Sequence, residues 1–82
     1  MHYVYILQGT KNNSPYTGIT TNLKQRIKNH NSGQVKSTSS KKPYKLIWYC
    51  AFASKINAYK FEKYLKSGSG VAFSKKHLNL KN

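Results

Sequence analysis

The feature that most constrains the fold is a continuous apolar run in the middle of the chain. It extends from Lys45 to Phe52 and is rich in β-branched and aromatic side chains. A run of this length and composition is typical of a strand. Because apolar residues fall on both of its faces, we expect both faces to be covered. The run therefore predicts the central or most covered strand of a sheet.

Two further stretches predict strands near the beginning of the sequence. His2–Gln8 is rich in tyrosine, valine and isoleucine, and Pro15–Thr20 is a second, shorter stretch. Gly9–Ser14 has the composition of a turn, so the pair is expected to form a hairpin. Side chains alternate between the two faces of a strand. The first strand thus presents two sets of residues: Tyr3, Tyr5 and Leu7 on one face, and Val4 and Ile6 on the other.

Helix signals follow each of the later strands. The first predicted helix runs from about Asn22 to His30, with Thr21 or Asn22 as its cap, Leu23 and Ile27 as its core stripe and Asn31–Gly33 as its end. The second begins after a Ser54 cap and runs to about Lys66, with Ala58, Phe61 and Leu65 at packing positions. A Ser-Gly-Ser-Gly turn ends it, and a last short helix is expected over Val71–Leu78, packing Phe73 and Leu78.

The element order β-β-α-β-α-α predicts a single α+β domain over residues 1–82. Its sheet is expected to be three-stranded and mostly antiparallel, with helices flanking it. A chain of 82 residues buries only about 60–65% of its unfolded surface, so the core is thin. Most of the seven tyrosines are expected to serve packing or to lie on the surface; this applies to Tyr3, Tyr44, Tyr49, Tyr59 and Tyr64.

The charge of the chain restricts its partners. Fifteen lysine or arginine residues oppose one acid, giving a formal net charge of +14. Such a domain attracts nucleic acid or an anionic membrane. No apolar run approaches the roughly 20 residues of a membrane span, and no basic amphipathic helix has a continuous apolar face. Nucleic acid is therefore the expected partner, and an anionic membrane surface is the alternative partner.

Two further stretches bear on partners and location. The serine- and lysine-rich segment Gln34–Lys42 is either a phosphate-contacting loop or a solvated linker, and composition does not decide between them. Cys50 is the only cysteine, so it forms no internal disulfide and is expected in the core. Reduced cysteine and the absence of a signal-peptide pattern predict a cytoplasmic protein.

Glu62 is the only acidic residue of the chain. In its simplest interpretation it forms a helix ion pair with Lys66, four residues later, worth about 0.3–0.5 kcal/mol. In the other, it is the one carboxylate side chain that a hard metal cation could use.

Arg26 is likewise the only arginine. It is either a chance surface residue or a phosphate ligand that needs the planar guanidinium fork. His30 lies one helical turn beyond it and could also be an ordinary helix-end histidine.

Several of these residues fall in a pattern that resembles the GIY-YIG nuclease superfamily. The pattern comprises Tyr3-Val4-Tyr5, Tyr16-Thr17-Gly18, Asn22–Ile27, His30–Gly33 and Phe61–Lys66. The resemblance covers nearly the whole chain and is strongest to the small stand-alone bacterial proteins of that superfamily. The chain departs from the name-giving motif, with Tyr3 in place of a glycine and Thr17 in the middle of the second triplet.

The resemblance implies a role for each matching residue. Tyr5 and Tyr16 would line the site, and Tyr5, Tyr16 or His30 would act as the general base. Arg26 would stabilise the phosphate, and Glu62 would hold a single Mg²⁺ or Mn²⁺. In a strongly positive site the phenolate form of tyrosine is expected to be favoured. The implied catalytic set is therefore Tyr5, Tyr16, Arg26, His30 and Glu62, and the expected DNA contacts are Lys24, Lys28, Lys36, Lys41 and Lys42.

The resemblance thus implies a metal-dependent DNA endonuclease that hydrolyses phosphodiester bonds. The alternative is a non-catalytic nucleic-acid-binding module on the same scaffold, since the charge predicts binding in both cases. Glu62 distinguishes the two, because a pure binder gains nothing from an acid that faces phosphate. A chain this small has no separate targeting domain, so dimer formation or a partner protein could direct it to DNA. Whether its pathway is DNA repair or another process is left open.

Overall fold

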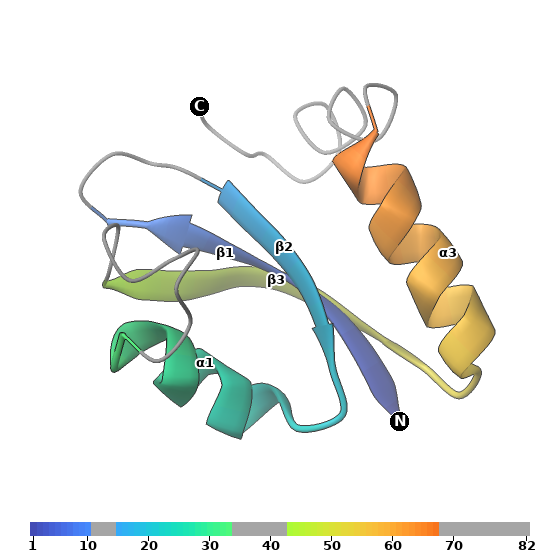
Figure 1. The fold of residues 1–82 in the computed structure, drawn as a ribbon, viewed down its shortest axis with the longest axis horizontal. Coiled ribbons are helices and arrows are strands. Elements are labelled where there is room, and N and C mark those ends of the chain that lie inside the picture. The colour runs from blue at the N-terminus through green and yellow to red at the C-terminus, as the bar shows by residue number, and fades with distance from the viewer. Residues whose placement is uncertain (11–14, 34–42, 68–82) are drawn as a thin grey trace.

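The first strand of the chain lies at the centre of the sheet. In the computed structural model, which describes residues 1–10, 15–33 and 43–67, β1 (His2–Gly9) pairs with β2 (Pro15–Thr20) on one side and with β3 (Tyr44–Phe52) on the other. Both pairings are antiparallel, and the strand order is β2-β1-β3 (Figure 1). The expected α+β fold with a three-stranded antiparallel sheet is confirmed.

The prediction that the apolar run forms the central strand is wrong, because β3 is an edge strand. The most covered strand is β1, which is buried continuously from Val4 to Gly9. In β3 the side chain of Tyr49 is exposed and most other residues are only partly covered. A bulge opposite Ile6 and Leu7 interrupts the pairing of β1 with β3. Apolar composition on both faces therefore marks a partly covered edge here.

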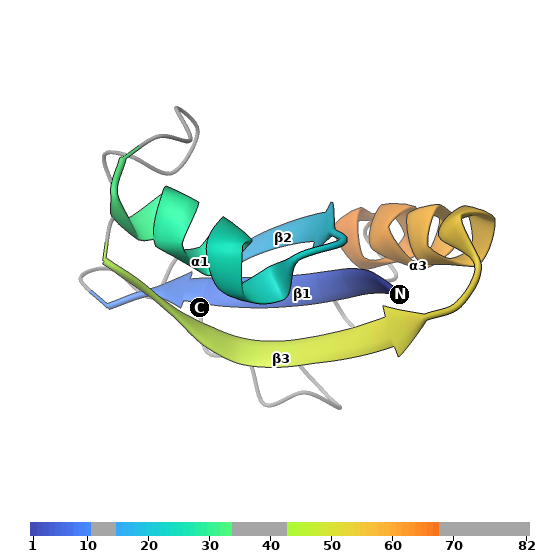
Figure 2. The ribbon, with the colours of Figure 1, turned by 90° about the horizontal axis from the view of Figure 1, so that it is seen from below.

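Two helices cover opposite faces of β1. They are α1 (Leu23–Asn31) and α3 (Lys55–Lys66), which lie well apart along the sheet (Figures 1 and 2). On one face the buried residues Val4, Ile6, Ala58 and Leu65 form a cluster that includes the core side of α3. On the other face Tyr5, Leu7 and Tyr44 form a second cluster, against which Leu23 and Ile27 of α1 pack. The predicted faces of β1 and the predicted helix stripes are confirmed.

Side-chain caps define where both helices begin. The Asn22 side chain accepts a hydrogen bond from the Gln25 N–H at 3.1 Å, and Ser54 Oγ accepts one from the Asn57 N–H at 3.3 Å. These bonds satisfy N–H groups that the first helical turn leaves without a partner. The chain leaves α1 through Gly33, whose positive φ of 83° favours glycine.

Some predictions concern residues outside those that the structure describes. These are the rest of the first turn, the segment Gln34–Lys42, the turn after Ser67 and the last helix over Val71–Leu78. Among the described residues, neither helix is long and apolar enough to cross a membrane.

Candidate active site

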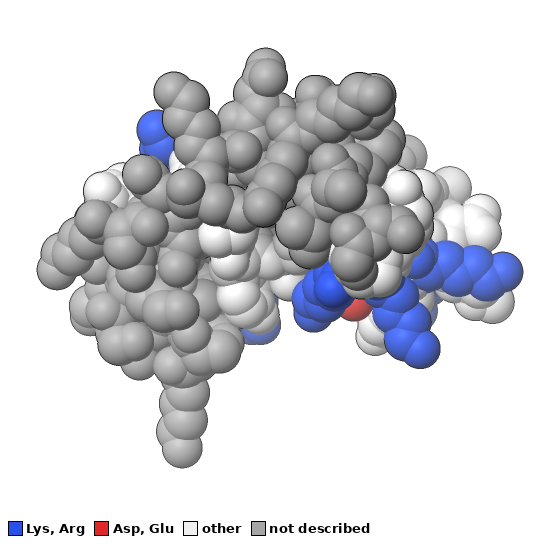
Figure 3. Space-filling model, turned by 90° about the horizontal axis from the view of Figure 1, so that it is seen from above, with Lys and Arg blue, Asp and Glu red and all other residues white. Residues whose placement is uncertain are grey.

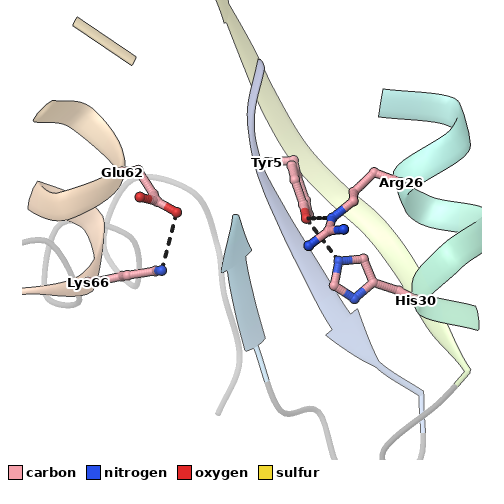
Figure 4. Close-up of polar contacts among 5 residues, drawn as sticks. All are labelled: Tyr5, Arg26, His30, Glu62 and Lys66. Carbon is pink, nitrogen blue, oxygen red and sulfur yellow. Dashed lines mark hydrogen bonds and ion pairs between the residues drawn. The ribbon is translucent and has the colours of Figure 1, made fainter. Parts of the chain in front are cut away.

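Three residues from two parts of the chain, β1 and α1, meet on the α1 face of the sheet. The Tyr5 hydroxyl lies 2.9 Å from His30 Nε2, and Arg26 Nε donates a hydrogen bond to the Tyr5 oxygen at 3.4 Å (Figure 4). Tyr5 and His30 are both 0% exposed. β1 provides the tyrosine, and one turn of α1 places the other two side chains over it. The structure thus brings together three of the predicted site residues.

Tyr16 of β2 completes this group. Its ring meets the His30 ring edge-on at a centroid distance of 4.8 Å and lies 6.4 Å from the Tyr5 ring. Unlike Tyr5 and His30, Tyr16 is only partly buried. Of the aromatic side chains in the group, it is the one that solvent can reach. We refer to Tyr5, Tyr16, Arg26 and His30 as the tyrosine–arginine cluster.

Gly18 is a residue of the site that sequence reasoning did not single out. It is the partner of Tyr5 in the antiparallel ladder, and the Tyr5 ring lies across it. A Cβ atom at this position would clash with the Tyr5 hydroxyl and lie 2.6 Å from Tyr5 Cζ. A glycine in the interior of a strand often marks such a close approach, so the signal was present in the sequence.

A pair of hydrogen bonds anchors the end of α1 to the start of β3. Asn31 Nδ2 donates to the Tyr44 carbonyl at 3.0 Å, and the Tyr44 N–H donates to Asn31 Oδ1 at 2.6 Å. The neighbouring residue on α1 is His30, and its ring lies 6.3 Å from the Tyr44 ring. This Asn31 clamp therefore helps to hold His30 over the sheet. It joins segments that are 13 residues apart and has no local sequence signature.

Burial and charge set the protonation states within the cluster. Burial raises the pKa of Tyr5, although the hydrogen bond and the charge of Arg26 act in the opposite direction. The expectation that a positive site would favour the phenolate is therefore wrong for Tyr5. Burial and the charge of Arg26 both lower the pKa of His30. The hydrogen bond to Tyr5 raises the pKa of Arg26, which keeps the guanidinium charged.

These directions favour one arrangement of protons at neutral pH. His30 is neutral and Tyr5 keeps its proton, so the Tyr5 O–H can donate to His30 Nε2 while its oxygen accepts from Arg26. Burial also raises the pKa of Tyr44, the next aromatic residue beside His30. The interior of the cluster is therefore uncharged, and the charge resides on the guanidinium at its edge.

Glu62 lies apart from the tyrosine–arginine cluster. It belongs to α3, and Figure 4 shows its carboxylate on the other side of β2 from Arg26 and His30. Its side chain is 13% exposed, and its carboxylate forms an ion pair with Lys66 at 3.2 Å. The ion pair expected from the four-residue spacing is therefore present. Glu62 is still close enough for its charge to raise the pKa of Tyr5 slightly, as the smallest of the contributions.

A metal could be held here by one carboxylate only. Among the residues that the structure describes, no three His, Cys, Asp or Glu side chains come together as a metal-binding group. Mg²⁺ often takes one or two carboxylates and fills its other positions with water and substrate phosphate oxygens. Glu62 fits such a site, provided that the cation displaces the Lys66 ammonium. Figure 3 shows the red carboxylate between blue basic side chains.

The predicted DNA-contacting lysines are only partly within the described residues. Lys24 and Lys28 are exposed on α1, the helix that also carries Arg26. The other three, Lys36, Lys41 and Lys42, lie outside the part of the chain that the structure describes. Of the expected basic surface, the exposed face of α1 is therefore the part that lies within the described residues.

Comparisons with known proteins show what the chain is similar to. A family model described as the GIY-YIG catalytic domain matches residues 1–76. A UPF0213 protein of Staphylococcus haemolyticus is 44% identical over 69 residues, which cover 83% of either chain. A UPF0213 protein of Clostridium perfringens is 46% identical over 67 residues, covering 80% of this chain and 71% of that protein. The solution NMR structure of a UPF0213 protein from Bacillus halodurans is similar with a TM-score of 0.57 and 40% identity, covering 98% of this chain and 84% of that one.

Proposed function

The chain belongs to the GIY-YIG family, and from this premise we propose that it is a metal-dependent endonuclease that hydrolyses phosphodiester bonds of DNA. The observation that carries the proposal is the tyrosine–arginine cluster. Its residues come from β1, β2 and α1, and the polar ends of Tyr5, Arg26 and His30 converge within hydrogen-bonding distance. A buried network of this kind holds a guanidinium in a fixed position, which is what stabilisation of a phosphate in the transition state requires.

The exposure of each side chain to solvent determines the role that we assign to it in the cluster. Tyr5 and His30 are fully buried and cannot contact an attacking water, so we assign them to positioning Arg26 and Tyr16. Tyr16 is partly exposed; its phenol would first release its own proton to solvent, and the resulting phenolate would accept the proton of the attacking water. Arg26 directs Nε at Tyr5, and the other N–H groups of its guanidinium bind the phosphate oxygens on which negative charge develops.

Glu62 would hold the Mg²⁺ or Mn²⁺, which when bound polarises the phosphate. Its position on α3 places the carboxylate across β2 from the cluster, so the scissile phosphate would lie between the two parts of the site. Without DNA, Lys66 neutralises this carboxylate. Substrate oxygens would thus complete a site that the chain builds only in part.

A plasmid-nicking assay with Mg²⁺ or Mn²⁺ tests this function. We expect Tyr16→Phe to lower the nicking rate by about 10²–10⁴-fold, the usual contribution of a positioned acid–base group. Glu62→Gln should also lower the rate, because the amide lacks the negative charge that would hold the metal. Tyr59→Phe is a matched control, since it removes an exposed phenol from α3 outside the cluster and should nick at the wild-type rate. Activity that survives Glu62→Gln or Tyr16→Phe would exclude this mechanism.

A non-catalytic nucleic-acid-binding module remains the second candidate function. The observation that favours it is the Glu62–Lys66 ion pair, which already gives the carboxylate a partner and keeps it away from Arg26. Under this alternative the protein binds DNA but nicks neither duplex, branched nor single-stranded substrates with either metal. Binding that is unchanged by Glu62→Gln would accompany that result.

A further inference from the structure

A hollow lies on the same face of the sheet as the tyrosine–arginine cluster. It has a volume of about 360 Å³ and is open to solvent. Its walls come from β1, β3 and the beginning of α1: Tyr3, Tyr49, Thr21, Asn22, Leu23 and Lys24. The resemblance to the nuclease superfamily assigned no role to Tyr3 or Tyr49, and the sequence predicted only packing or surface positions for them.

The two tyrosines form an aromatic wall. Their ring centroids are 6.2 Å apart, and the rings are tilted by 59°. Tyr49 is 53% exposed, so part of its ring is open to solvent. The exposed ring offers aromatic surface at the wall of the hollow. Nucleobases stack on surfaces of this kind, whatever their sequence.

The hollow lies beside the beginning of α1, on the face of the sheet that carries Tyr5. Tyr49 is the ladder partner of Tyr5, so both side chains lie on one face of neighbouring strands. Tyr3 precedes Tyr5 by two residues on that same face. On α1, Lys24 lies about 3 Å along the helix axis from Arg26, on a different side of the helix, so the hollow and Arg26 flank the same helical turn. One strand of a nucleic acid could therefore contact Arg26 through a phosphate and reach the hollow with a neighbouring nucleotide.

The charge of the walls suits the same occupant. Lys24 is exposed at the rim, and no acidic residue lines the hollow. The chain has one acid, and it lies on α3. An aromatic surface with a lysine at its edge matches a nucleotide, whose base stacks and whose phosphate needs a cation.

We infer that the Tyr3–Tyr49 hollow binds the base of an unpaired nucleotide next to the phosphodiester bond that is cut. The position next to the cleaved bond rests on the proposed function, whereas the binding of a base in the hollow does not. It specifies the substrate class as DNA with an unpaired nucleotide at the cleavage site. A base that stays paired and stacked inside a duplex cannot enter the hollow without being extruded.

The test measures binding without cleavage. The probe is a single-stranded DNA of about eight nucleotides, within the usual site size of roughly 4–16. It carries one 2-aminopurine, whose fluorescence falls when the base stacks, and EDTA is present throughout. We expect quenching with the wild type and with Tyr49→Phe. Tyr49→Ala should lose the quenching and weaken binding by about 10-fold, the scale of one base–aromatic stack.

Matched controls separate stacking from loss of structure. Tyr59→Ala removes a tyrosine of similar exposure, 48%, from α3 and should bind as the wild type does. Tyr3→Ala should repeat the effect of Tyr49→Ala, and far-ultraviolet circular dichroism checks that each variant is folded. A probe of the same length that is abasic at every position should no longer distinguish Tyr49→Ala from the wild type.

The outcomes distinguish this inference from the proposed function. Quenching that depends on Tyr49, together with no nicking under any condition, supports base binding in the hollow and excludes the proposed endonuclease function. If nicking depends on Glu62 while quenching and affinity are unchanged in folded Tyr49→Ala, base binding in the hollow is overturned and the proposed endonuclease function stands. Equal affinity of the wild type for the fully abasic and the 2-aminopurine probes would also overturn the inference.

Discussion

At the scale of single residues, the site depends on a side chain that is missing. Gly18 leaves room for the Tyr5 ring, and the Tyr5 hydroxyl then reaches both Arg26 and His30. Because Tyr5 is fully buried, its ring has little space to move if that room is filled. The second triplet of the motif thus provides both Tyr16 and a glycine that leaves space for the Tyr5 ring.

Gly18→Ala is therefore expected to destabilise the fold by about 1–3 kcal/mol, the usual cost of overpacking a filled interior. The new methyl group displaces the Tyr5 ring and breaks its hydrogen bond to His30, so the nicking rate should fall as well. Urea denaturation measures the stability.

The double variant with Tyr5→Phe provides the control, because it removes the hydroxyl that the methyl group meets first. The cost of Gly18→Ala should be smaller in that background. Equal costs in the two backgrounds would contradict the steric explanation.

The sequence predicted that Tyr5, Arg26 and His30 would share a site, and the structure confirms that they meet. It could not predict the direction of the Tyr5 pKa. That direction depends on whether burial or the Arg26 charge is the larger effect, and burial is a property of the whole packed interior. The sequence likewise left two interpretations of Glu62, and the structure shows the ion pair with Lys66.

At the scale of elements, the Asn31 clamp fixes α1 against β3. Asn31→Ala would leave the partly buried N–H of Tyr44 without its partner, at a cost of about 1–3 kcal/mol. The end of α1 should then loosen, and His30 with it, so nicking should also decrease. Urea denaturation and the nicking assay together check this.

Asn29→Ala is the matched control on the same helix. Its side chain accepts a hydrogen bond only from the exposed Gln25 amide among the contacts described, and alanine is the better helix former. Stability should change by less than about 0.5 kcal/mol. A loss in Asn29→Ala as large as in Asn31→Ala would show that the clamp has no special weight.

Local patterns predicted the elements well but not their order in the sheet. Helix caps at Asn22 and Ser54 follow from short-range hydrogen bonds, and both are confirmed. The position of β3 at the edge depends instead on pairing between residues more than 30 positions apart. An apolar run can occupy the centre or the edge, provided that helices cover enough of it. The strand that combines tyrosine with valine and isoleucine, β1, took the centre.

At the scale of the whole molecule, a net charge of +14 makes binding to DNA dependent on salt. The logarithm of the binding constant should fall linearly with the logarithm of salt concentration, by about 0.9 for each phosphate neutralised. Replacing Lys24 and Lys28 by glutamine should reduce that slope by about one per lysine. Fluorescence anisotropy with duplex DNA measures it.

Lys45→Gln is a comparison variant outside α1, because Lys45 is an exposed residue at the beginning of β3. If it reduces the slope as much as Lys24→Gln does, the contact is non-specific and α1 is not the DNA-facing helix. Liposomes of anionic lipid offer a competitor of similar charge. A preference for them over DNA would favour the membrane alternative.

The position of β1 has a consequence for synthesis on the ribosome. Its residues belong to both core clusters, so each helix packs on a cluster that is incomplete without β1. Yet β1 precedes both of its partners, and β3 is completed only at Phe52. A nascent chain that has left the exit tunnel as far as α1 can form the hairpin of β1 and β2 but still exposes the other edge of β1. Folding is therefore expected to be delayed until β3 emerges, and the chaperones that meet the chain would do so at that open edge.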